Sequence, residues 1–292
     1  HVVTRRQRQM CIRDRKDPTP KSEYDVVIIG GGGHGLATAY YLAKEHKITN
    51  VAVIEKGWIG GGNVGRNTTI IRSNFMYDAN ARFNEFGMDL WRNLSQELNF
   101  NVMFSPRGII NLAHSDAQMN AYARRGNSMR LNGIDAVLLN REQVKEIIPM
   151  ADFSENVRFP IFGGLMQPSA GTARHDAVAW GYARQADSMG VDIIQNCEVI
   201  GFDVVAGKIK GIRTSRGNIK AKKVGICVAG STNILAEKLN MTLPIETHLL
   251  QACVSEPVKP VLDNVVTFGA GHFYVSQSDK GEMVMGGDLD GY

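Results

Sequence analysis

The sequence predicts an α/β protein that begins with a strand, a helix and a second strand and adds antiparallel strands later in the chain. Residues 25–29 and 51–54 are continuous apolar runs, which are typical of strands buried on both faces of a sheet. Residues 36–47 between them are rich in Ala, Leu, Tyr and Lys and contain no Gly or Pro, as expected of a helix. From residue 191 onward, short strand patterns alternate with turn residues. These observations indicate a β-α-β unit joined to a second, largely antiparallel layer.

Length and composition are those of a folded globular protein. The 292 residues suffice for one large domain or two interleaved ones, and 43% hydrophobic and 21% charged residues lie far from the disordered range. The formal net charge is +4, and the basic excess lies in the first 22 residues, which carry neither interleaved aromatic residues nor an amphipathic apolar face. We therefore expect no nucleic-acid partner and no membrane partner.

Cysteine usage and hydropathy argue against several further classes of protein. The four cysteines are widely spaced and form no CxxC pair, so neither a metal site nor a disulfide framework is predicted. No apolar run approaches the roughly 18 residues needed to cross a bilayer, and the first residues lack the apolar core of a secretory signal. We expect a cytoplasmic protein.

Further helices and two groups of strands are expected after the opening unit. Helices are predicted at residues 80–98, 115–131, 141–148 and 176–189. Asp176 is the expected N-cap of the last helix. In the first of these helices, the residues expected to face the core are Phe83, Gly87, Leu90, Trp91, Leu94 and Leu98. Strands are predicted at residues 108–112, 191–194, 198–205, 208–214, 224–228, 252–254, 265–268, 273–277 and 282–286. Those between 198 and 228 should form an antiparallel meander that returns to a parallel strand.

A glycine-rich turn, Gly30-x-Gly32-x-x-Gly35, follows the first predicted strand and opens the first helix. Gly30 permits the tight turn, Gly32 allows a pyrophosphate to approach the backbone, and Gly35 allows helix and strand to pack closely. Glu55 lies 20 residues after Gly35, where a carboxylate can accept both ribose hydroxyls of an adenosine and would repel a 2′-phosphate. The sequence thus predicts a dinucleotide other than NADP at this turn. A purely structural turn is the alternative.

A second glycine-dense loop, at residues 60–69, favours a flavin dinucleotide over NAD. It carries Arg66 and hydroxyl side chains, which suit the phosphates and the N1–C2 carbonyl region of a buried flavin. A surface loop with a solvated arginine is the alternative. The strand at 224–228 ends in small residues, where the backbone could pass close to the cofactor. Val199 could meet an adenine through its backbone or simply belong to the core.

Four motifs together resemble the beta subunits of heterotetrameric sarcosine oxidases. They are Gly30 to Leu36, Glu55-Lys56-Gly57, Gly60 to Ser73, and Thr172 to Gly181. The resemblance extends from about Tyr24 to Tyr292. The motifs around Arg66 and His175 separate this family from the wider FAD-dependent amine and D-amino-acid oxidases, with which it is expected to share only the glycine turn and Glu55.

The resemblance implies a glutathione-reductase-like FAD-binding domain interleaved with an antiparallel, D-amino-acid-oxidase-like substrate domain. The expected FAD-binding domain comprises residues 24–76 and 170–235, and the expected substrate and interface domain comprises residues 77–169 and 236–292. Residues 1–23 are expected to be a disordered or artefactual lead-in. The fold is expected to be truncated at the C-terminus, with the natural chain continuing past Tyr292.

The resemblance also implies two flavins. FAD would bind non-covalently, and FMN would be attached covalently to His175. Attachment requires a neutral imidazole, and Arg174 and the helix start at Asp176 are expected to keep His175 unprotonated. The residues alone leave open a helix-start histidine without any cofactor. The residues expected to bind FAD are Gly30, Gly32, Gly33, Gly35, Glu55, Lys56, Gly61, Asn63, Arg66, Thr68, Ile70 and Val199.

The implied activity is the oxidative demethylation of sarcosine to glycine. Electrons would pass from FAD to FMN and then to oxygen, which gives hydrogen peroxide, and tetrahydrofolate on an alpha subunit would capture the imine as methylenetetrahydrofolate. Gamma and delta subunits complete the implied heterotetramer. Two alternatives stay open: a single-flavin amine or D-amino-acid dehydrogenase with an unmodified His175, and a non-catalytic flavin-binding fragment. No catalytic residue is assigned.

Overall fold

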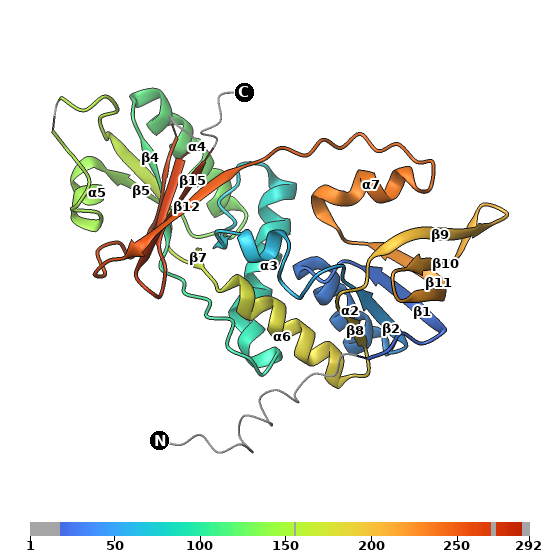
Figure 1. Ribbon diagram of the computed structural model, residues 1–292. Coiled ribbons are helices and arrows are strands. Elements are labelled where there is room, and N and C mark those ends of the chain that lie inside the picture. Colours follow the sequence, from blue (N-terminus) through green and yellow to red (C-terminus); the bar gives the residue numbers. More distant parts are fainter. Residues whose placement is uncertain (1–17, 155, 270–272, 288–292) are drawn as a thin grey trace, which may run out of the picture. The chain divides into compact units, whose positions relative to one another are not determined.

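The chain alternates between two structural units in the computed structural model (Figure 1), which describes residues 18–154, 156–269 and 273–287. Unit 1 contains residues 1–67, 98–101 and 175–247, and unit 2 contains residues 68–97, 102–174 and 248–292. Most of the expected lead-in, residues 1–17, lies outside the described residues. The main unit boundaries lie at residues 67, 174 and 247, whereas the sequence predicted domain boundaries at residues 76, 170 and 235.

A six-stranded sheet forms the centre of unit 1. In spatial order its strands are β8 (Asp192–Ile194), β2 (Val51–Ile54), β1 (Glu23–Ile29), β11 (Gly217–Ile226), β10 (Lys208–Thr214) and β9 (Val199–Val205). β1 pairs in parallel with β2 and β11, whereas β11, β10 and β9 are antiparallel to one another. The predicted meander that returns to a parallel strand is therefore confirmed. The strand predicted at 224–228 is the end of a longer strand, β11.

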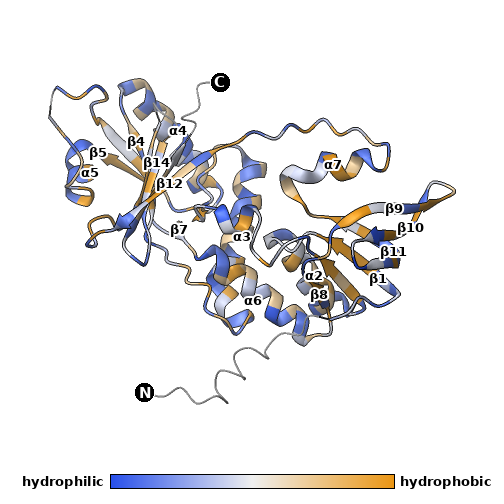
Figure 2. Ribbon diagram, viewed as in Figure 1, coloured by the Kyte–Doolittle hydropathy of each residue, from blue (hydrophilic) through white to orange (hydrophobic). Residues whose placement is uncertain are grey.

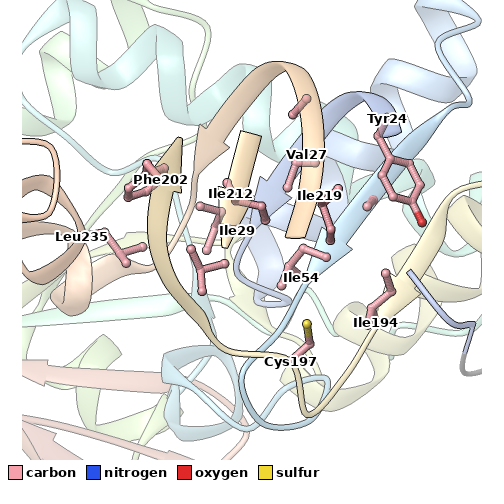
Figure 3. Packing of buried hydrophobic residues seen from close by; sticks show 13 residues of the cluster. Tyr24, Val27, Ile29, Ile54, Ile194, Cys197, Phe202, Ile212, Ile219 and Leu235 are labelled. Atoms are coloured by element: carbon pink, nitrogen blue, oxygen red, sulfur yellow. The ribbon is translucent and has the colours of Figure 1, made fainter. Parts of the chain in front are cut away.

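The apolar runs of β1 and β2 are buried on both faces of this sheet, as their continuous pattern predicts, and β1 stands out as hydrophobic in Figure 2. One face carries a cluster that includes Val27, Ile54 and Phe202 (Figure 3). The other face is covered by α2 (Gly33–His46) and α6 (His175–Ser188), which pack together through Tyr40 and Tyr182, with ring centroids 5.5 Å apart. Each large buried aliphatic side chain contributes about 1.5–3 kcal/mol, so this core holds the first strand and helix firmly in place.

The helix that follows the expected N-cap at Asp176 begins one residue earlier than predicted. His175 is the first residue of α6 in the structure, and Asp176 lies in its first turn. The Asp176 carboxylate accepts a hydrogen bond from the amide of Ala177 at 2.9 Å. Asp176 therefore lies inside the helix, and the prediction that it is the N-cap is wrong.

Unit 2 is built on a seven-stranded sheet. Its spatial order is β12 (Gln251–Pro257), β15 (Glu282–Gly287), β14 (Phe273–Gln277), β13 (Val265–Phe268), β4 (Ile109–Ala113), β6 (Gly163–Gln167) and β5 (Val137–Asn140). Only β13 and β4 are parallel neighbours. α4 (Asp116–Leu131) and α5 (Arg141–Ile147) pack on β4, β5 and β6. β3 (Ile70–Ile71) and β7 (Gly171–Thr172) form a separate two-stranded antiparallel sheet.

The predicted strands of this unit are confirmed, whereas β3, β5, β6 and β7 were not predicted. Three further elements were not predicted either: the short helix α7 (Thr232–Glu237) and the 3-10 turns η1 (Asn63–Arg66) and η2 (Ala229–Ser231).

The face of α3 (Asp78–Glu97) that points to the core agrees with the predicted one except at one position. Leu94 and Leu98 are buried as expected, and Gly87, Leu90 and Trp91 are half-buried. Phe83 is 77% exposed, so the prediction that it faces the core is wrong. The buried hydroxyl of Ser73 also contacts this helix, since its Oγ donates to Glu85 Oε2 at 2.5 Å.

Within the described ranges, no helix is long and apolar enough to cross a bilayer. The same residues contain no group of three or more His, Cys, Asp or Glu side chains that could hold a metal ion. Among the described cysteines, Cys197 is buried, Cys227 is half-buried and Cys253 is exposed, and all three are free thiols.

Candidate functional site

The glycine turn between β1 and α2 adopts a geometry that only glycine allows at two positions. Gly30 has a φ of +109°, and a Cβ there would lie 2.3 Å from the carbonyl oxygen of Cys227. A Cβ on Gly35 would lie 2.0 Å from the carbonyl oxygen of Gly30. The tight turn at Gly30 and the close helix–strand approach at Gly35 are therefore both present.

Gly32 has different surroundings, because nothing lies within 4 Å of the position its Cβ would take. It is the N-cap of α2, with φ −85° and ψ −176°, and no side chain among the described residues caps this helix end. Gly33 is the first residue of the helix, and the first turn contains no acidic residue. The unpaired amide groups at this end are open to an anionic ligand, which fits a pyrophosphate.

The carboxylate of Glu55 is fixed by two backbone amides directly beside the glycine turn. Oε2 accepts from the amide of Gly31 at 2.7 Å, and Oε1 accepts from the amide of Gly57 at 2.8 Å. These donors stabilise the ionised carboxylate and leave each oxygen with acceptor capacity. Glu55 is thus positioned to accept ribose hydroxyls at the end of β2.

Backbone also passes close to the turn from β11, as expected from the small residues after this strand. The Cys227 oxygen and Val228 Cγ1 would lie 2.3 and 3.3 Å from a Cβ on Gly30. Val199 begins β9, and its side chain belongs to the core cluster of unit 1. Its side chain is therefore structural, and only its backbone could meet a ligand.

The second glycine loop is folded on itself. Arg66 Nη1 donates to the carbonyl oxygen of Gly61 at 2.9 Å, across η1, which contains Asn63. Lys56 is exposed. Thr68 and Ile70 belong to unit 2, so the expected FAD-binding residues are divided between the two units. Those that the structure brings together in unit 1 are Gly30, Gly32, Gly33, Gly35 and Glu55.

His175 and Arg174 stand where the chain passes from unit 2 to unit 1. His175 is half-buried at the start of α6. Arg174 Nη1 forms an ion pair with Asp279 Oδ2 at 3.2 Å, in the turn between β14 and β15. A carboxylate therefore balances part of the Arg174 charge that was expected to act on His175.

Two half-buried arginines of unit 2 were missed by the sequence reasoning. Arg72 follows β3, and Arg125 lies in α4. Partial burial lowers the pKa of both guanidinium groups; the charge of Arg72 lowers that of Arg125 further, whereas Tyr122 acts in the opposite direction. Among the described residues, neither arginine has a carboxylate partner. Since a partly desolvated charge is unfavourable without a counter-charge, this part of unit 2 is suited to an anion.

The segment that carries Arg72 is held by fully buried polar side chains. Gln167 Oε1 accepts from the amide of Ser73 at 3.0 Å, and Gln167 Nε2 donates to Ser73 Oγ at 2.7 Å. The Arg72 guanidinium lies 4.5 Å from the ring centroid of Phe75. The only sequence signal for such a site was the position of Arg72 within the motif that ends at Ser73.

Known proteins resemble this chain closely. The family model of FAD dependent oxidoreductases matches residues 25–292. Sarcosine oxidase subunit beta of Rhizobium meliloti (strain 1021) is 62% identical over 277 residues, which are 95% of this chain and 66% of that protein. Sarcosine oxidase subunit beta of an Arthrobacter species is 52% identical over 94% of this chain and 68% of its own length. The chain thus spans about two thirds of the length of these relatives.

Among solved structures, L-proline dehydrogenase from P. horikoshii superposes with a TM-score of 0.85 at 29% identity, over 92% of this chain and 71% of that one. Glycine oxidase from Geobacillus kaustophilus superposes with a TM-score of 0.80 at 20% identity, over 92% of this chain and 74% of that one, which shows a shared mixed α/β fold. With the glycine turn, Glu55 and the two sheets in place, the chain belongs to the FAD dependent oxidoreductase family, in which its sequence groups with subunit beta of sarcosine oxidase.

Proposed function

We propose that the protein is the FAD-binding beta subunit of a heterotetrameric sarcosine oxidase and oxidises sarcosine to glycine. The observation that carries this proposal is the 62% identity to sarcosine oxidase subunit beta over 95% of the chain. Bound FAD would supply the two-electron oxidation. The glycine turn and Glu55 support a dinucleotide site, in a unit for which we propose a glutathione-reductase-like arrangement.

The residue proposed to bind the sarcosine carboxylate is Arg72. Its side chain is half-buried and has no carboxylate partner among the described residues, so a substrate carboxylate would supply the missing counter-charge. Guanidinium and carboxylate form paired, charge-assisted hydrogen bonds, which would orient the amine end of the substrate. Arg72→Met is expected to raise the KM for sarcosine about 100-fold, as for the loss of a buried charge pair.

The remaining parts of the proposal concern the assembled enzyme. FMN would be attached covalently to His175, and alpha, gamma and delta subunits would complete a cytoplasmic heterotetramer. Electrons would leave through FMN to oxygen, with hydrogen peroxide and methylenetetrahydrofolate as products. The half-buried position of His175 at the start of α6 leaves the imidazole accessible, which supports a covalent attachment there.

Two measurements test the proposal on the full-length subunit co-expressed with its partner subunits. Sarcosine-dependent peroxide formation tests the activity. Acid precipitation tests the covalent flavin, because a covalently bound flavin leaves yellow colour in the pellet. His175→Ala should give a colourless pellet, whereas His46→Ala, an exposed histidine of unit 1, should not. A yellow pellet from His175→Ala would show that FMN is attached elsewhere.

A single-flavin amine dehydrogenase is the second candidate function. The TM-score of 0.85 to an L-proline dehydrogenase at 29% identity favours it. The same assembled preparation separates the two: a single non-covalent flavin, with electrons passed to an artificial acceptor but not to oxygen, would support the dehydrogenase.

A further inference from the structure

A chain of polar side chains links the two half-buried arginines of unit 2. Arg72 Nη1 donates to Asn74 Oδ1 at 2.6 Å, and Asn74 Nδ2 donates to Asn111 Oδ1 at 2.6 Å. Arg125 Nη2 donates to the same Asn111 oxygen. The Asn111 Nδ2 group donates to Thr267 Oγ1. The five side chains come from the segment after β3, from β4, from α4 and from β13, so the chain of contacts crosses the unit.

The hydrogen bonds in this chain have a defined direction. Asn111 Oδ1 has two acceptor sites, and Asn74 and Arg125 occupy both. If the Asn111 amide turned over, its NH2 group would face two donors. The orientation of Asn111 in turn requires Asn74 to present its NH2 to Asn111 and its oxygen to Arg72. Arg72 and Arg125 can only donate, so the two guanidinium groups fix the polarity of the chain from its two ends.

Arg125 is poorly satisfied if its role is only structural. Its Nε is buried without a hydrogen-bond partner in the described part of the chain, and the guanidinium lies over the Tyr122 ring, 4.9 Å from the centroid. Partial burial of a charge with incomplete pairing is unfavourable, and an apolar side chain of similar size would pack there without that cost. A stability cost of this kind is typical of residues retained for function.

We propose that Arg125 is a positioning residue for carboxylate binding, acting on Arg72 through Asn111 and Asn74. This inference rests on the proposed function of Arg72. Without the Arg125 donor, Asn111 Oδ1 loses one of its two partners. The Asn111 and Asn74 side chains are then held less firmly, and the Arg72 guanidinium, which donates to Asn74, is aligned less well. Affinity for a carboxylate falls, while the flavin site in unit 1 keeps all of its own contacts.

The test uses the full-length, flavin-loaded enzyme assembled with its partner subunits. Acetate is the probe, because it presents a carboxylate without an amine, and its dissociation constant is read from the perturbation of the flavin absorption spectrum. Arg125→Met should weaken acetate binding and raise the sarcosine KM about tenfold each, with a smaller effect on kcat. The midpoint of thermal unfolding should not fall, since an incompletely paired buried charge is removed.

Three further variants make the test specific. Arg124→Met, at the exposed neighbouring position of the same helix, should bind acetate like the unaltered enzyme. Arg125→Lys keeps a charge and a donor and should restore most of the affinity. In an Asn74→Ala background, where the chain of contacts is already broken, Arg125→Met should have no additional effect. If Arg125→Met does not assemble, Arg125→Lys tests the same point. Its small loss of acetate affinity should appear when Asn74 is present and should be absent in the Asn74→Ala background.

Several outcomes would overturn the inference. Unchanged acetate affinity in Arg125→Met would contradict the positioning role. If Arg125→Met weakens acetate binding just as much in the Asn74→Ala background, the charge of Arg125 acts on the carboxylate directly and not through Asn74. A lower unfolding midpoint that Arg125→Lys does not restore shows a structural role. If Arg72→Met binds acetate normally, the proposed carboxylate site itself fails; if Arg72→Met loses acetate binding and Arg125→Met does not, only the role of Arg125 fails.

Discussion

Replacement of Gly32 by alanine tests the dinucleotide site without disturbing the fold. The backbone of Gly32, with φ −85°, suits an alanine, and its Cβ would meet no atom within 4 Å. Gly32 is the N-cap of α2, where alanine is less favourable than glycine, so the substitution itself costs about 0.5–1 kcal/mol of stability. Any larger effect must arise from a ligand.

The expected effect on FAD binding follows from what the methyl group would displace. If the pyrophosphate lies against the amides at the start of α2, the Cβ of residue 32 occupies space that the phosphate oxygens need. Loss of one charge-assisted hydrogen bond is worth about 1.5–3 kcal/mol, which corresponds to roughly a 10- to 100-fold weaker affinity for FAD. The midpoint of thermal unfolding of the flavin-free protein should fall by only about 1–4 °C, which corresponds to the N-cap cost alone.

Gly35→Ala is the matched control, because its methyl group meets protein instead of ligand. Its Cβ would lie 2.0 Å from the Gly30 carbonyl oxygen, so α2 would have to move away from β1 by on the order of 1 Å. This overpacking should cost about 1–3 kcal/mol of stability in the absence of FAD. Titration of flavin-free protein with FAD, followed by flavin fluorescence, and thermal denaturation followed by circular dichroism measure both variants. Unaltered FAD affinity in Gly32→Ala would refute the placement of the pyrophosphate.

Three further predictions concern single contacts. Glu55→Gln sets an NH2 group against one of the amides of Gly31 and Gly57, so the free energy of unfolding should fall by about 1–3 kcal/mol and FAD affinity with it, measured by urea denaturation and FAD titration. Burial, helped by the hydrogen bond to Asp192, raises the pKa of Tyr24, so the folded state keeps a proton that the unfolded chain releases above about pH 10. Stability should therefore fall as pH rises above that value, and Tyr24→Phe should flatten this fall in urea titrations at about pH 9 to 11. Asp279→Asn breaks a partly exposed ion pair with Arg174 and should change the free energy of unfolding by less than about 1 kcal/mol; a larger loss would show that the pair is shielded from solvent.

The features that the sequence predicted well are those decided by neighbours in the chain. Strands β1 and β2, helix α2 and the glycine turn lie within about thirty residues, and each is marked by apolar runs or by backbone geometry that only glycine permits. The meander of β9 to β11 was predicted for the same reason, since short turns join its strands. Strands β3 and β7 were missed because each has only two residues and is defined by a partner about a hundred positions away.

Helix α3 shows what hydrophobic spacing can and cannot predict. The spacing correctly placed Leu94 and Leu98 in the core, but it failed at Phe83, which is exposed. It also gave no sign that Glu85 accepts a hydrogen bond from the hydroxyl of Ser73, which is itself held by Gln167 on β6. Spacing within one helix carries no information on a partner from another segment, so the sequence could not reveal this polar contact.

Charge is the property that sequence reasoning handled least well in the candidate sites, because the effect of a charge depends on burial and pairing. Arg174 was expected to act on His175 as a free cation, but Asp279, more than a hundred residues later in the chain, shares its charge. Arg72 and Arg125 are the opposite case, since both are half-buried without a carboxylate partner among the described residues. An arginine that is already paired mainly stabilises its own surroundings, whereas an unpaired buried one remains able to bind an anion. The two uncompensated guanidiniums of unit 2, and not the arginine beside His175, are therefore the positive charges most available to an anionic substrate.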